Sequence, residues 1–414
     1  MRHDKHILML LCVLLAGLWL APCAEVQGAN VIRTAKESIK KRQKLPDTAK
    51  ALLEEAAKVE TTNRDRAECY RLAAECHRQI HLQENTKLYL HQAYDTALFF
   101  SSLLEMFRLS EQADSVAMQP DERGRTPHVK LRRSRDYLQP YRQNLLNGGK
   151  WQLMHHRPAD AFRYFDTYIH LADTPPFAAD SLLKTDPQMP QVAYLATYMA
   201  HEAQMSDAVV RHSPLAKRAE GQQVEFIQEY LCRAYQTKGD TLEMIVNLRE
   251  GLHEWPQHEF FFSRLLDHYA LTGQFKAGLA VADSMLTVDE KKPLYWYARS
   301  LFLLKLHEDS KAIVACDRCI ELDSTYVDAH YNKGIAALNL AVAYARTACT
   351  DITNPQCQRD LEVLRSLYQM ARTPMETVRR LQPDATDRWA APLYRIYLNL
   401  NMGREFDEMD RLLK

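Results

Sequence analysis

The chain has 414 residues, 46% of them hydrophobic, and a formal net charge of zero at pH 7. This apolar content can bury a large core, and the zero net charge gives no bulk electrostatic argument for a nucleic-acid or anionic-membrane partner. Only 12 glycines are present, and apolar residues recur at helical spacing, so we predict an all-α fold.

Residues 1–28 have the pattern of a secretory signal peptide. Arg2 and Lys5 precede an apolar run, and small residues before Ala29 offer a cleavage site. We therefore expect an exported protein of the periplasm or cell envelope, with no integral membrane span after cleavage. Two alternatives remain open here, an uncleaved anchor and lipidation at Cys23, although Pro22 is a poor match to a lipidation signal.

The region 29–135 is predicted to be helical, with degenerate repeats. One long helix is expected over 85–113, followed by a polar loop over 118–128. The basic segment KLRRSR, residues 130–135, is interpreted as a solvated loop or a helix start rather than a binding site.

The region 136–414 is more regular. Helical pairs are predicted over 142–175 and after an insertion at 178–190. Four units then follow at 225–258, 259–292, 293–326 and 327–385, the last with an inserted loop, and a final helical pair ends the chain. Each of the first three units starts 34 residues before the next. Small residues such as Gly278, Ala312 and Gly334 recur where two helices must approach closely.

This 34-residue pattern resembles the tetratricopeptide repeat (TPR), a helix–turn–helix unit. The resemblance implies an all-α TPR solenoid of about seven to nine helical hairpins. The C-terminal segment APLYRIYLNLNMGREFDEMDRLLK, the predicted long helix and the NGG at 147–149 are also similar to exported TPR proteins of Bacteroidota-type bacteria. That group carries no established reaction.

No catalytic signature is present. The sequence has no GxxxxGK[ST], GxGxxG, GxSxG or HExxH pattern, so we expect neither an enzyme nor a cofactor. His77 and His81 are four residues apart on a predicted helix, but ordinary histidines are favoured over a metal site. Cys349 and Cys357 flank a loop; they could close it as a disulfide in an oxidising compartment or remain two thiols.

The resemblance implies a protein or peptide partner held in a concave groove, with carbohydrate-uptake accessory (glycan-binding) protein as the alternative. In TPR arrays the first helix of each pair lines that groove. Counting its non-packing offsets from each repeat start predicts these partner-binding residues: Asn147, Lys150, Tyr194, Phe226, Tyr230, Arg233, Phe260, Arg264, Asp267, Tyr297, Tyr331 and Asn332. The set lacks the Lys/Asn/Lys/Arg pattern by which some TPR proteins grip a C-terminal carboxylate.

Overall fold

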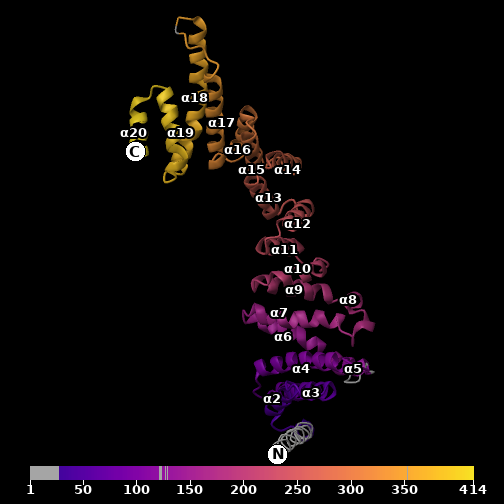
Figure 1. Ribbon diagram of the computed structural model, residues 1–414. Coiled ribbons are helices and arrows are strands. Elements are labelled where there is room, and N and C mark those ends of the chain that lie inside the picture. The colour runs from indigo at the N-terminus through magenta and orange to yellow at the C-terminus, as the bar shows by residue number, and fades with distance from the viewer. Residues whose placement is uncertain (1–27, 121–123, 126, 128, 352) are drawn as a thin grey trace, which may run out of the picture. The chain divides into compact units, whose positions relative to one another are not determined.

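The structure is a computed structural model that describes residues 28–120, 124–125, 127, 129–351 and 353–414. Across these ranges the regular structure is helical and no β-strand occurs (Figure 1). The chain forms two compact units, divided between Met244 and Ile245 within helix α12 (Thr241–Glu254). The division predicted at residue 136, which concerned the regularity of the repeats, stays a prediction.

The first unit begins with a helix at 28–41, followed by α2 (Leu45–Ala56), α3 (Asn63–Tyr89) and α4 (Thr96–Ala117). Their apolar faces enclose one cluster, because the buried positions recur every three or four residues. Leu52, Cys69, Cys76 and Leu109 are fully buried in this cluster. Cysteine therefore acts here as a small hydrophobic residue.

The prediction of one long helix over 85–113 was wrong. α3 ends at Tyr89 and α4 starts at Thr96, with His91 in the left-handed region at φ 54° between them. Local hydrogen bonds make the break. The Asp95 carboxylate accepts from the Leu98 backbone N–H (2.9 Å) and so caps α4, while buried Glu84 accepts from the Asp95 N–H (2.9 Å).

The rest of the first unit consists of helical pairs joined by short turns. Its elements are α5 (Leu131–Leu138), η1 (Gln139–Tyr141), α6 (Arg142–Met154), α7 (Pro158–His170), η2 (Leu171–Asp173), η3 (Ala178–Asp180), α8 (Leu182–Thr185), α9 (Met189–Glu202), α10 (Ser206–Ala216) and α11 (Val224–Lys238). The pairs predicted after residue 142 are present, and α5 shows that KLRRSR is a helix start.

A buried ion pair ties the predicted insertion to the repeat before it. The Arg142 guanidinium lies 2.6 Å from the Asp186 carboxylate and 3.8 Å from the centre of the Tyr168 ring. The Tyr168 hydroxyl donates to the same carboxylate (2.7 Å). Burial would raise the pKa of Asp186, but the hydrogen bonds from Tyr168 and Gln188 and the charge of Arg142 together hold it below its usual range. The insertion is therefore anchored rather than loose.

The second unit continues as helical pairs. Its elements after α12 are α13 (Glu259–Leu271), α14 (Phe275–Val288), α15 (Pro293–Lys305), α16 (Asp309–Leu322), α17 (Val327–Ala345), α18 (Pro355–Leu381), α19 (Thr386–Asn399) and α20 (Gly403–Leu413). Helices α13, α15 and α17 begin at the predicted repeat starts. The long helix α18 lies beside α17, and the inserted loop joins them (Figure 1).

The turns within the helical pairs share one backbone conformation. Gly239, Gly273 and His307, 34 residues apart, all have positive φ values of 74°, 70° and 59°. In each, the next backbone N–H bonds back to the carbonyl four residues before the turn residue, as in Glu308 N–H to Leu303 O (2.9 Å). This is the Schellman end of a helix, which needs a left-handed residue. His156, Gln204 and Asn401 repeat the conformation, and the sequence reasoning missed all three.

Small residues stand where adjacent helices touch, as predicted, both between pairs (α14 and α15) and within a pair (α17 and α18). A Cβ atom added to Gly278 would lie 2.2 Å from Cζ of Phe302, and one added to Gly334 would lie 2.6 Å from Cε of Met375. Ala312 has no exposed surface. The predicted fold class, an all-α superhelix of helical hairpins, is confirmed within each unit.

Candidate functional site

The first helices in the first unit carry six of the predicted groove residues. Asn147 and Lys150 on α6 are exposed, and the other four are half-buried, namely Tyr194 on α9 and Phe226, Tyr230 and Arg233 on α11. Helices α9 and α11 are in contact. The side chains of α9 and α11 therefore come from adjacent first helices, as the repeat offsets require.

Tyr230 belongs to a stack of rings on α9 and α11. Its ring is stacked on His201, with centroids 4.0 Å apart and planes at 15°, and on Tyr198 at 6.1 Å and 20°. Burial raises the pKa of Tyr230 to about 12. The contacts hold the ring in place and use its faces internally, while Tyr194 lies nearby in the same partly buried set.

In the second unit, three predicted residues lie together on α13. The Arg264 guanidinium is 5.7 Å from the centre of the Phe260 ring and 3.6 Å from the Asp267 carboxylate. Arg264 and Asp267 are exposed and Phe260 is half-buried. This is an exposed ion pair beside an aromatic ring, on the first helix of its pair.

The remaining predicted residues differ in exposure. Tyr297 packs against Tyr326 with ring centroids 5.3 Å apart, and burial raises its pKa to about 12. Tyr331 is half-buried under Arg388, whose guanidinium carbon is 4.7 Å from the ring centre. Asn332 is buried, and its amide donates to the Ser300 hydroxyl (3.2 Å) between α15 and α17. Its assignment to an open groove was wrong, because this offset faces the adjacent first helix.

The two cysteines beside the inserted loop are thiols in the structure rather than a disulfide. Cys349 is partly exposed and Cys357 is buried. Burial, followed by the neighbouring charge of Cys349, raises the pKa of Cys357. Oxidation of this pair stays a prediction, which intact mass after alkylation, with and without reductant, would check.

His81 is buried and uses both ring nitrogens. Nδ1 lies 2.9 Å from the Phe99 carbonyl oxygen and Nε2 lies 3.3 Å from the Asn144 amide nitrogen. A metal shared with His77 would have to displace these contacts. In the ranges that the structure covers, no three His, Cys, Asp or Glu side chains are grouped as metal ligands. His155 and His156, in the turn between α6 and α7, are exposed.

The predicted signal peptide, apart from Gly28, lies outside the described residues, and so does Cys23. Among the helices that the structure describes, none combines the length and the hydropathy needed to cross a lipid bilayer.

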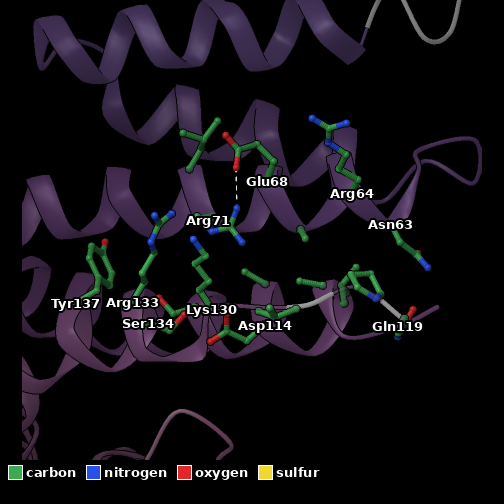
Figure 2. A pocket seen from close by; sticks show the side chains of 18 of the residues that line it. Asn63, Arg64, Glu68, Arg71, Asp114, Gln119, Lys130, Arg133, Ser134 and Tyr137 are labelled. Atoms are coloured by element: carbon green, nitrogen blue, oxygen red, sulfur yellow. Dashed lines mark hydrogen bonds and ion pairs between the residues drawn. The ribbon is translucent and has the colours of Figure 1, made fainter. Parts of the chain in front are cut away.

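A pocket that sequence reasoning missed lies in the first unit, between α3, α4 and α5 (Figure 2). Its volume is about 960 Å³. The polar lining residues are Asn63, Arg64, Glu68, Arg71, Glu75, Ser110, Asp114, Gln119, Lys130, Arg133, Ser134 and Tyr137. Apolar wall residues include Leu72, Ala113, Val116 and Val129. The volume is in the range of small-ligand pockets in proteins.

The two glutamates of α3 in this pocket already have cationic partners. Glu68 is 2.8 Å from Arg71 and 2.9 Å from Lys36. Glu75 accepts from Arg78 (2.6 Å). Burial alone would raise the pKa of the Glu75 carboxyl, but hydrogen bonds from Arg78, Gln79 and Tyr137 and the charge of Arg78 together lower it.

Asp114 differs from those glutamates. It is 4% exposed, and Ser134 donates to its Oδ1 (2.8 Å), but its Oδ2 is buried without a hydrogen-bond partner in the described part of the chain. Burial raises the pKa of the Asp114 carboxyl, opposed by the Ser134 hydrogen bond and the charge of Arg71. The only part of this pocket that the sequence analysis singled out is the segment KLRRSR, which contributes Lys130, Arg133 and Ser134. Asp114 lies outside that segment.

Comparison with protein families finds no match, and comparison with curated proteins finds none. Among the solved structures to which this chain is similar are proteins described as TPR-repeat proteins. They include the C-terminal part of a TPR protein from Cytophaga hutchinsonii, 11% identical over 62% of this chain and 93% of that one, with a TM-score of 0.36. A TPR protein from Bacteroides fragilis is 15% identical over 66% of this chain and 98% of that one, with a TM-score of 0.31. Yeast Tom70 is 13% identical over 93% of this chain and 88% of that one, with a TM-score of 0.33.

Proposed function

We propose that the protein is an exported, non-catalytic scaffold that binds a protein or peptide with the first helices of its repeats. The supporting observation is the mixed surface on those helices. Tyr194, Phe226 and Tyr230 are half-buried in one unit, and Arg264 stands exposed beside Phe260 in the other. Tyrosine and arginine are enriched at the energetic centres of protein interfaces.

Rigid aromatic side chains favour this function. The rings of Tyr198 and His201 both stack on Tyr230, so little side-chain entropy of Tyr230 remains to be lost when a partner binds. The same stacking disfavours the glycan-binding alternative at Tyr230, because a sugar ring needs an open aromatic face and His201 stacks on this ring.

A triple substitution tests the proposal. In the variant Tyr230→Ala, Arg264→Ala and Tyr297→Ala, capture of the partner from envelope extract should fall by at least about tenfold, since each hot-spot truncation typically costs more than 1 kcal/mol. The control replaces the exposed second-helix residues Leu242, Val246 and Val314 by Ala, and it should bind normally. Retained capture by the first variant, with helicity intact, would place the binding face elsewhere. Binding on a glycan array without protein capture would favour the alternative function.

Export has its own test. N-terminal sequencing of the protein from the envelope fraction should give Ala29 or a residue next to it, as the signal pattern predicts. A mature chain that retains Met1, or that begins at a lipidated Cys23, would contradict the proposed processing.

A further inference from the structure

The pocket between α3, α4 and α5 holds basic side chains that the fold does not neutralise. Arg64, Lys130 and Arg133 line it, and their side chains make no hydrogen bond or ion pair with any residue that the structure describes. In Figure 2 Lys130 and Arg133 extend toward α3, where Arg71 lies. Because the pocket glutamates are already paired, this region carries a local excess of positive charge that suits an anionic group.

At Asp114 the same pocket needs a hydrogen-bond donor, whereas its basic side chains suit an anionic group. A carboxylate oxygen that is buried without a partner is costly, and such groups are normally satisfied by a donor. Ser134 satisfies only Oδ1. The charge of Arg71 acts on the Asp114 carboxyl, so the acidic and basic groups lie within electrostatic range of each other. A ligand that met both would need a cationic donor close to an anion.

We propose that this pocket binds a small zwitterion, namely a free peptide of two to four residues. Its ammonium group donates to Asp114 Oδ2, and its terminal carboxylate lies against Lys130 and Arg133. Apolar side chains of the peptide contact the wall formed by Leu72, Ala113 and Val116. This binding activity goes beyond the proposed scaffold function and does not depend on it.

The size and polarity of the pocket favour a peptide over a simple anion. An inorganic anion would satisfy the basic side chains but would leave Asp114 Oδ2 unpaired and the apolar wall uncovered. A two- to four-residue peptide spans at most ~7–14 Å when extended, a length suited to a pocket of about 960 Å³. A single amino acid would leave most of this volume empty.

Titration calorimetry of the purified full chain tests the proposal. The probes are the dipeptides Ala-Leu and Ala-Glu, each compared with its N-acetylated form, its C-terminal amide and inorganic phosphate. At least one dipeptide should bind with a Kd of about 1 mM or tighter, and either cap should weaken binding at least about tenfold, the loss expected for one charge-assisted hydrogen bond. The proposal is overturned if neither dipeptide binds up to 10 mM (roughly −2.7 kcal/mol), if capping has no effect, or if phosphate binds as tightly.

Three variants locate the binding. Asp114→Asn keeps the side-chain shape and should abolish the preference for the free ammonium group. Arg133→Gln, at an exposed position whose loss should not affect folding, should weaken the dipeptide at least about tenfold. Arg132→Gln is the matched control, since Arg132 is the adjacent residue of α5 with its side chain 88% exposed and outside the pocket. Equal affinities in Arg133→Gln and Arg132→Gln would refute the proposed site.

Discussion

His307 occupies a backbone position that glycine fills in the two preceding repeats. Its φ of 59° matches the 70° of Gly273, and a residue with a Cβ atom pays about 1 kcal/mol or more to adopt this conformation. Glycine loses more chain entropy on folding, which offsets part of the strain that it relieves. We therefore expect His307→Gly to raise the free energy of unfolding by about 0.5–1 kcal/mol. Gly273→Ala should lower it by about 1 kcal/mol. Thermal melting of both variants checks the pair; a loss of stability in His307→Gly would contradict the turn assignment.

His81 gives a second prediction for a single residue. Burial lowers its pKa below the usual value of about 6.5, although the contact with the Phe99 carbonyl favours the charged form. In the window from about pH 6.5 down to the folded-state pKa, the unfolded chain binds the proton more readily, so stability falls as pH falls. The melting temperature should therefore drop between pH 7.5 and 5.5, and less steeply in His81→Leu. Equal slopes would show that His81 does not carry this dependence.

At the scale of helices, Gly278 and Phe302 test the close approach between α14 and α15. A Cβ at residue 278 would lie 2.2–2.5 Å from atoms of the Phe302 ring, and that ring is 1% exposed and cannot move freely. Gly278→Ala should therefore cost about 1–3 kcal/mol through overpacking. Gly403→Ala is the control, because a Cβ there meets nothing within 4 Å. Adding Phe302→Leu to Gly278→Ala should recover part of the loss in denaturant melts, and no recovery would contradict this explanation.

The sequence predicted the regular helices well because their period is set by packing between neighbours. The starts of α13, α15 and α17 coincide with the predicted repeat starts at 259, 293 and 327. The helix prediction failed at 85–113, where the apolar pattern continues across a turn. The positive φ of His91 and the hydrogen bond from the Asp95 N–H to Glu84 form this turn. Hydropathy does not report such local hydrogen bonds.

The candidate sites were less predictable than the fold. The offset rule placed Arg264 and Asp267 on an exposed first-helix surface. It placed Asn332 there as well, but Asn332 is buried and its side-chain amide donates a hydrogen bond to Ser300. The pocket was missed because its residues come from three helices and share no repeat offset. Its basic groups and Asp114 meet only after α3, α4 and α5 have packed.

For the whole molecule, repeat architecture implies that damage stays local, since each pair contacts chiefly its neighbours. Ala312 is fully buried in a cluster with Leu303 and Ala336, so Ala312→Phe should destabilise its surroundings by roughly 1–3 kcal/mol or more. Hydrogen exchange should accelerate over 293–345 in the second unit and remain unchanged over 142–216 in the first. Val314→Phe, at a 58% exposed position of the same helix, is the control and should leave both regions unchanged. Faster exchange throughout the chain would mean that the two units unfold as one cooperative body, and unchanged exchange near residue 312 would mean that the helix register is wrong.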